Sequence, residues 1–413
     1  MSQTLISNIS QMVTFQGVAK KRGRRPTLQD LGVIENSCII LNGEKIQWVG
    51  PKKKLPKLSV QKKIDAKGMV CFPGLIDAHT HLVFGGSRED EFAMRAQGKS
   101  YLDIAKSGGG ILSTVQSTQS ASLKSLIQFG KKRLQYARTL GVTAIEMKSG
   151  YGLTVKDELK MLHAIAQLKK TEKTHIVSTF LGAHAFPKNM HQNAYTLLIC
   201  EKMLPEIGRK KLADFCDVFI DSGFFNLAQT KKILLTAQKN GLHLRIHSDE
   251  FKALGGTELA VSFKAKSVDH LIAISKKGVL ALKNSDTVAT LLPGTSFFLG
   301  KPYAPARKLI DAGVVVCFAT DFNPGSSTTQ NLPFMTTLAM TQMKVTLAEA
   351  LSGITYNAAK SLGLEQEMGS IEAGKLANLA FFEIPNFKYF PYHYGENFCK
   401  LVIWKGKPVV HLA

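Results

Sequence analysis

Two histidines with a spacing suited to metal binding follow a short apolar segment in FPGLIDAHTHL. His79 and His81 are two residues apart, and in an extended backbone such residues point to the same side. Two imidazoles on one face supply half of a metal site, although an H-x-H pair alone is also common among ordinary surface histidines. Residues 74–78 predict a strand that directs the pair toward one end of a sheet.

Further nitrogen and oxygen donors follow two later apolar segments. HLRIHSDEF contains His247 with Asp249 and Glu250, and VVVCFATDFNPGS contains Asp321. Taken alone, His247 would more often be a hydrogen-bonded core histidine. A barrel would bring it close to His79, His81 and Asp321, and the four side chains would then surround one position. Such a donor set suits a divalent metal ion with one position left open for water.

Two more histidines and a lysine end other apolar segments. His270 in SVDHL and His184 in FLGAHAFP are candidates for a further ligand, a proton shuttle or a substrate donor. Lys148 is the last residue of the apolar segment that runs into EMKSGYGL, and Tyr151 follows shortly after it. In some metal-dependent barrel hydrolases a lysine at this place is carboxylated and bridges two metals. We favour the alternative, a salt-bridged structural lysine.

These residues can act together only in a fold that brings the ends of several strands close to one another. Amphipathic, lysine-rich segments such as 123–140, 156–169 and 227–240 predict helices between short apolar strands. Eight alternating units predict an α/β fold, a closed (β/α)8 TIM barrel, whose active sites lie at the C-terminal ends of the strands. The eight strands are expected at residues 74–79, 142–148, 176–183, 217–221, 242–248, 268–271, 287–292 and 314–320.

The sequence pattern predicts β structure at both ends of the chain. Strands are expected at residues 37–41 and 46–49, on either side of Asn42-Gly43, which is a hairpin signal. Later strands are expected at 377–382, 400–405 and 408–411. We therefore expect the barrel at residues 73–368 and a small composite β-sandwich domain built from both termini, at residues 1–72 and 369–413.

The charge balance is strongly basic and is concentrated near the start. The 413 residues hold 53 Lys and Arg against 31 Asp and Glu, a net charge of +22, and residues 1–70 alone hold 13 against four. The run KKRGRR at residues 20–25 could contact nucleic acid or an acidic membrane. Because no aromatic residues are interleaved as a stacking surface would need, a solvated loop is favoured.

The compartment is expected to be the cytoplasm. Six cysteines lie far apart without a CxxC pair, which suits reduced thiols. The first residues, MSQTLISNISQMVTF, lack the early positive charge and the apolar core of a secretory signal. No apolar stretch approaches the ~18 residues of a membrane span. We expect neither nucleic acid nor a membrane as a partner.

The motifs together resemble those of the amidohydrolase superfamily. The resemblance rests on FPGLIDAHTHL, SVDHL, ATDFNPGS and the late segment GSIEAGKLANLAFFE. Within the superfamily, HTHLVFGGSREDEFAMRAQGKSYLDIAKSGGGI, EMKSGYGL, TFLGAHAFP and TDFNPGS are similar to motifs of the imidazolonepropionase family. The resemblance implies a homodimeric hydrolase of carbon–nitrogen bonds in cyclic amides, which converts 4-imidazolone-5-propanoate to N-formimidoyl-L-glutamate in histidine degradation.

The resemblance also implies roles for individual residues. One zinc or iron ion per chain would be held by His79, His81, His247 and Asp321. Glu250 would orient the substrate and transfer protons, His270 would polarise the carbonyl, and Asp321 is a second candidate for proton relay. Arg88 suits a grip on the propionate, or else an ion pair with Glu89 or Glu91. The anionic imidazolone would contact Arg88, Tyr101, Tyr151, His184, Glu250, Asn323, Gly325 and Ser326.

Two alternatives remain at this point. Another amidohydrolase, such as a purine or pyrimidine-type heterocycle deaminase, would share the metal residues but would give no reason for Arg88, Tyr151 and His184 together. A polyanion-binding or regulatory protein would place the function in the basic N-terminal region. The intact set of candidate ligands favours an enzyme over this second alternative.

Overall fold

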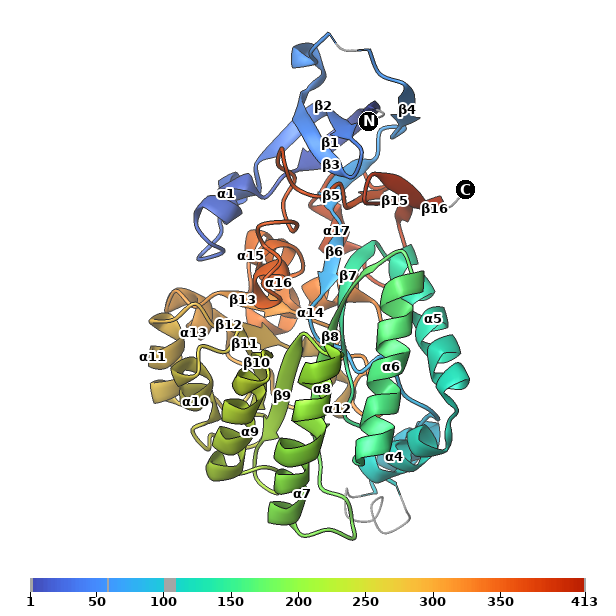
Figure 1. Ribbon diagram of the computed structural model, residues 1–413. Coiled ribbons are helices and arrows are strands. Elements are labelled where there is room, and N and C mark those ends of the chain that lie inside the picture. Colours follow the sequence, from blue (N-terminus) through green and yellow to red (C-terminus); the bar gives the residue numbers. More distant parts are fainter. Residues whose placement is uncertain (1–2, 58, 100–108, 412–413) are drawn as a thin grey trace.

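Eight parallel strands form a barrel at the centre of the molecule (Figure 1). The computed structural model describes residues 3–57, 59–99 and 109–411. Neighbouring barrel strands pair in chain order, and every predicted strand is present with ends within two residues of those expected. The strands are β6 (Leu75–Asp77), β7 (Val142–Lys148), β8 (His175–Ala183), β9 (Phe215–Ile220), β10 (His243–Ser248), β11 (Ser267–His270), β12 (Val288–Leu291) and β13 (Val316–Phe318).

The barrel closes just beyond its first and last strands. His81 N donates a hydrogen bond to Phe322 O at 2.9 Å, and Asp321 N donates to His79 O at 3.1 Å. These bonds join the segment after β6 to the segment after β13. The backbone contacts that close the barrel therefore also place His79, His81 and Asp321 side by side.

Helices follow most of the strands and cover the outside of the barrel (Figure 1). The helices predicted at 123–140, 156–169 and 227–240 are α5 (Leu123–Thr139), α6 (Val155–Thr171) and α9 (Leu227–Lys239). Thr154 and Asn226 cap α6 and α9 by accepting hydrogen bonds from first-turn N–H groups, which otherwise have no partner. Among the described residues, no helix has both the length and the apolar character that crossing a membrane requires.

The remaining helices are shorter, and several lie in the connections that carry cavity residues. They are α1 (Gln16–Lys20), α2 (Glu89–Ala96), α4 (Ile111–Ser120), α7 (Gln192–Leu198), α8 (Leu204–Lys210), α10 (Gly256–Ser262), α11 (Lys276–Lys283), α12 (Pro293–Leu299), α13 (Ala306–Asp311), α14 (Leu332–Met343), α15 (Leu347–Gly353), α16 (Tyr356–Ser361) and α17 (Tyr389–Tyr392), with single turns η1 (Leu28–Leu31), η2 (Lys52–Lys54) and η3 (Ile199–Met203).

A separate mixed sheet is built from both ends of the chain, as predicted (Figure 1). It has its own apolar core, which includes Ile6, Met12 and Leu379. Its long first strand was not predicted, because a register shift between Ile6 and Ile9 interrupts the alternation that identifies a strand. The strands are β1 (Gln3–Val13), β2 (Val33–Asn42), β3 (Lys45–Pro51), β4 (Lys62–Asp65), β5 (Val70–Pro73), β14 (Leu379–Phe382), β15 (Cys399–Trp404) and β16 (Lys407–His411).

The basic segment at residues 20–25 packs against the barrel. Arg24 donates hydrogen bonds to Gly313 O and, at 2.6 Å, to Ser285 O. Arg22 pairs with Asp286 at 3.0 Å, although its side chain is 69% exposed. The expectation of a solvated loop is therefore wrong for Arg24. Its guanidinium donates hydrogen bonds to backbone carbonyl groups just before β12 and β13.

Candidate active site

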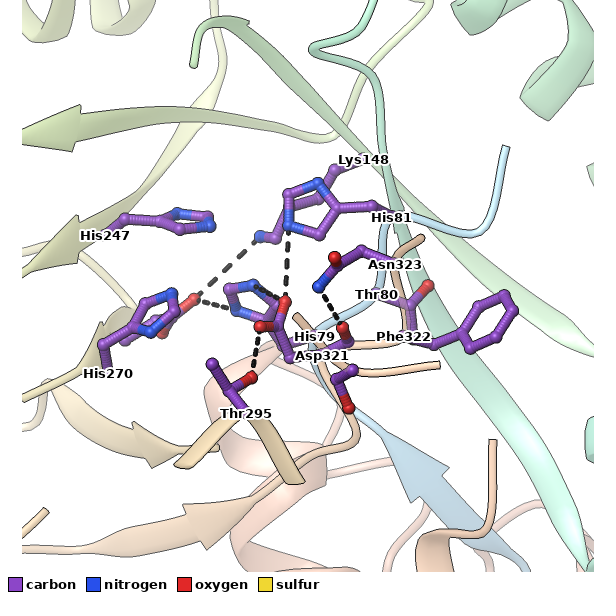
Figure 2. Close-up of polar contacts among 12 residues, drawn as sticks. His79, Thr80, His81, Lys148, His247, His270, Thr295, Asp321, Phe322 and Asn323 are labelled. Carbon is purple, nitrogen blue, oxygen red and sulfur yellow. Dashed lines mark hydrogen bonds and ion pairs between the residues drawn. The ribbon is translucent and has the colours of Figure 1, made fainter. Parts of the chain in front are cut away.

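Three imidazoles and one carboxylate converge at the C-terminal ends of the barrel strands (Figure 2). His79 and His81 follow β6, His247 lies in β10 and Asp321 follows β13. Asp321 Oδ1 lies 3.4 Å from His79 Nε2 and 3.5 Å from His81 Nε2, and the ring centroids of His79 and His247 are 4.6 Å apart. The fold thus brings together the four residues predicted as metal ligands.

The donor atoms of this centre fit a metal ion. His79 Nε2 and His247 Nε2 are buried and have no hydrogen-bond partner among the described residues, which is costly for polar atoms. Burial lowers the pKa of His79, His81 and His247 well below the usual range, so each neutral imidazole keeps a lone pair for a ligand bond. Two atoms bound tetrahedrally at about 2.0–2.2 Å from one ion lie about 3.3–3.6 Å apart, which matches the spacing around Asp321.

Two buried aspartates lie beside the Nδ1 atoms of His79 and His247. Asp269 Oδ2 lies 2.7 Å from His79 Nδ1, and Asp217 Oδ2 lies 3.0 Å from His247 Nδ1. The Lys148 ammonium lies 2.7 Å from Asp217, which confirms the salt-bridged alternative for that lysine. Sequence reasoning missed both aspartates. Each aspartate is a charged residue within a predicted buried strand. Because a buried charge needs a partner, this position could have identified both aspartates.

Glu250 and His270 form a pair beside the centre. Glu250 Oε2 is 3.5 Å from His270 Nδ1, and the His270 ring centroid is 5.1 Å from that of His247. Burial, with the charges of Asp321 and Asp221, raises the pKa of Glu250 to about 8. Burial lowers the pKa of His270 to about 4. A carboxyl group that titrates near neutral pH beside a neutral imidazole is suited to moving a proton.

The centre opens into a cavity of about 600 Å³. Sequence reasoning missed Phe219, Phe224 and Phe251, which also line it; these aromatic residues follow or end strands β9 and β10, a position that could have identified them. Tyr101 lies outside the described residues. The other residues predicted to contact substrate all line the cavity: Arg88, Tyr151, His184, Glu250, Asn323, Gly325 and Ser326.

Arg88 is held in place by Glu91, an acidic residue in the first turn of the helix that follows it, α2. Its Nε donates to Glu91 Oε1 at 2.9 Å, and its Nη2 donates to Glu91 Oε2 at 2.7 Å. The same carboxylate accepts from Gly110 N at 2.8 Å. Arg88 Nη1 lies against Gly325, where a β-carbon would overlap it. Glu91 accepts from Nε and Nη2, so both N–H groups of Nη1 and the second one of Nη2 remain for a ligand.

Another buried carboxylate fixes the loop that carries Tyr151. Glu158 in α6 accepts hydrogen bonds from Gly150 N at 3.1 Å and Gly152 N at 2.7 Å. His184 Nδ1 in turn lies 3.2 Å from Gly150 O. Tyr151 and His184, whose ring centroids are 5.3 Å apart, are therefore positioned from a common backbone segment.

Sequence relatives match this chain over nearly their full length. Residues 70–409 match the amidohydrolase family. The imidazolonepropionase of Alkaliphilus metalliredigens (strain QYMF) is 43% identical over 417 residues, covering 99% of this chain and 98% of the relative. That of Bacillus velezensis (strain DSM 23117 / BGSC 10A6 / LMG 26770 / FZB42) is 44% identical over 409 residues, covering 98% and 97%.

Solved structures show the same architecture at much lower identity. Atrazine chlorohydrolase of Arthrobacter aurescens TC1, complexed with zinc, aligns with a TM-score of 0.75 and 17% identity over 99% of this chain and 95% of that one. An adenosine deaminase from Xanthomonas campestris with bound zinc gives 0.73 and 14% over 99% and 93%. At such identities the likeness establishes the fold alone.

The barrel, the histidine and aspartate centre at its strand ends and the family match define an amidohydrolase. The relatives that match over nearly their full length identify one family among the amidohydrolases. The chain belongs to the imidazolonepropionase family.

Proposed function

We propose that this chain hydrolyses 4-imidazolone-5-propanoate to N-formimidoyl-L-glutamate, a step of histidine degradation. One observation carries the proposal: a centre suited to a metal ion opens into a cavity that also holds the pair Glu250 and His270 and the cation Arg88. This combination suits a small anionic ring whose amide bond must be opened. The names of the full-length relatives support the same reaction.

His79, His81, His247 and Asp321 would hold one zinc or iron ion per chain. Imidazole nitrogen and carboxylate oxygen suit both ions, and the buried, unpartnered Nε2 atoms of His79 and His247 support the assignment. When bound, the ion supplies a Lewis acid that makes water a stronger nucleophile near neutral pH.

Glu250 is the proposed proton carrier. In the reaction the water oxygen becomes bonded to the ring carbonyl carbon, the amide C–N bond breaks, and the ring nitrogen gains a proton. Glu250 takes a proton from the attacking water and returns it to the nitrogen, and a pKa of about 8 suits both transfers. His270 donates a hydrogen bond to the carbonyl oxygen as negative charge develops there. Asp321, which also faces the centre, is the second candidate for proton relay.

The propionate of the substrate would bind at the part of the cavity that Arg88 lines. Its Nη1 donates to one carboxylate oxygen, while the ion pair with Glu91 holds the guanidinium in place. Tyr151 and His184 would contact the ring from the loop anchored by Glu158, and Asn323, Gly325 and Ser326 would contact it from the segment after β13. Tyr101 belongs to the same proposed set of substrate contacts.

We also propose a cytoplasmic homodimer without nucleic-acid or membrane partners. The six cysteines are free and buried, which suits a reducing compartment. The candidate self-contact is an aromatic cluster in which the exposed Phe297 and Tyr394 flank the partly buried Phe334, with ring centroids 5.8 Å and 5.9 Å from that of Phe334. Phe297→Ser should shift the sedimenting species from dimer to monomer. Duplex DNA should show no salt-dependent binding to the wild type.

The reaction is tested by following the ultraviolet absorbance of freshly generated imidazolone propanoate. We expect metal-dependent loss of the ring chromophore with formimidoylglutamate as the product. Enzyme stripped with a chelator should be inactive and should recover on addition of zinc or iron. Ammonia release from purine or pyrimidine heterocycles, without imidazolone turnover in a metal-loaded sample, would instead favour a heterocycle deaminase.

A further inference from the structure

A cluster of charged side chains lies directly behind the proposed metal ligands. Glu146, Lys148, Asp217, Arg245 and Asp269 are all 0% exposed, although charged groups are rarely buried so completely. They come from four barrel strands, β7, β9, β10 and β11, with β8 lying between β7 and β9. Because burying charge is costly unless each group is paired, a cluster of this size at this place requires an explanation.

Lys148 is the member that contacts the most carboxylates. Its Nζ lies 2.8 Å from Glu146 and 2.7 Å from Asp217, and 3.9 Å from Asp269. The ammonium thus donates hydrogen bonds to Glu146 and Asp217, while Asp269 lies at ion-pair distance. Arg245 supports Asp269 from another direction, with Nη2 3.1 Å from Asp269 Oδ2.

Two of these carboxylates are those that touch the ligand histidines. Asp269 Oδ2 lies 2.7 Å from His79 Nδ1. Asp217 lies 3.0 Å from His247 Nδ1 through Oδ2, and its Oδ1 accepts the backbone N–H of His247 at 3.2 Å. The hydrogen bond to Asp269 selects the His79 tautomer in which Nε2 carries the lone pair. Asp217 instead anchors His247 through the backbone N–H of that histidine, because Asp217 Oδ2 lies near Nδ1 without forming a hydrogen bond. One ammonium therefore contacts both of the groups that aim His79 and His247.

We propose that Lys148 is a positioning residue that couples two metal ligands, His79 and His247, by holding Asp217 and Asp269 in place. The proposal rests on the ligand assignment made under the proposed function. The same contacts argue against a carboxylated Lys148, because a carbamate would place a negative charge against three acidic side chains. The lysine acts on the metal site without being a ligand itself.

The test compares Lys148→Met with the wild type in a competition for Zn²⁺ against a chromophoric chelator. A positioning role predicts affinity weaker by about 10–100-fold, the usual effect of losing a partner behind a ligand. It also predicts an altered Co²⁺ absorption spectrum, since the ligand geometry changes. If Lys148 only repelled the cation, its removal would tighten binding. Unchanged or tighter Zn²⁺ binding would overturn the proposal.

A matched control separates positioning from general damage to a buried ion pair. Arg138 is 9% exposed and pairs with Glu172 at 3.0 Å, at the end of α5 and away from the centre. Arg138→Met should lower the melting temperature but leave Zn²⁺ affinity unchanged. Loss of Zn²⁺ affinity in this control, to the extent seen in Lys148→Met, would assign the effect to destabilisation and refute the proposal.

Further variants keep the proposal testable if Lys148→Met does not fold. Lys148→Gln retains N–H donors but loses the charge, and it should also bind Zn²⁺ more weakly. Asp217→Asn should cost less in the Lys148→Gln background than in the wild type, because the two residues act through the same imidazole; strictly additive effects would refute the coupling. Zn²⁺ binding is measured without substrate, so failure of imidazolone turnover would refute the proposed function and leave these results standing.

Discussion

The guanidinium of Arg88 occupies the space that a β-carbon on residue 325 would need. Gly325 follows β13 and Arg88 precedes α2, so residues from opposite ends of the barrel sequence share one side of the cavity. A glycine at position 325 is therefore a condition for the observed placement of the cation.

Gly325→Ala should displace Arg88 and weaken substrate binding. We expect KM to rise about 10-fold, equivalent to about 1.4 kcal/mol, with a smaller change in kcat. Steady-state kinetics on the imidazolone measure both. The double variant with Arg88→Ala should be no worse than Arg88→Ala alone, because the two changes act through the same group. Additive effects would show that Gly325 has another role.

Glu250→Gln should remove the acidic limb of the pH–rate profile. Glu250 must be deprotonated to accept a proton, so activity should rise as the pH increases through its pKa. Burial raises that pKa to about 8, and a cation in the centre would lower it by stabilising the carboxylate. The limb should therefore lie below pH 8, and it should disappear in Glu250→Gln together with most of kcat. An unaltered limb in the variant would assign the titration to Asp321.

Asp321→Asn should abolish turnover and weaken metal binding. The substitution removes the only carboxylate in the proposed ligand set, so Zn²⁺ affinity should fall by at least about 10-fold. Metal content after gel filtration gives the direct readout. Asp249→Asn is a suitable control, because Asp249 is also a buried aspartate near His247 but accepts from Thr257 Oγ1 at 2.6 Å. Asp249→Asn should keep its metal.

Glu158→Gln should loosen the segment that carries Tyr151. The change replaces charge-assisted hydrogen bonds to Gly150 and Gly152 with weaker ones, at a cost of about 1–3 kcal/mol in stability. KM should rise because the loop lines the cavity. Glu172→Gln alters another buried glutamate, paired with Arg138, and should lower stability with KM unchanged. Equal KM values in the two variants would contradict a positioning role for Glu158.

The local pattern of the sequence was sufficient to predict the barrel and the candidate ligands. Alternating apolar strands and amphipathic helices are visible within short windows, and the i, i+2 spacing of His79 and His81 fixes their common side in any strand. Because barrel strands end at one mouth, His247 and Asp321 could be placed beside them without knowledge of the packing.

The tertiary structure alone decided which residues support those ligands. Asp217, Asp269 and Lys148 lie on different strands, and their pairing depends on strand order and on which side chains point into the barrel. Arg24 reaches a carbonyl nearly 300 residues away in the chain. The ion pair of Arg88 with Glu91, three residues on, was by contrast one of the alternatives predicted from the sequence. Buried charges must be neutralised by whatever partner the packing brings near, and that partner is set by three-dimensional proximity, which sequence spacing does not encode.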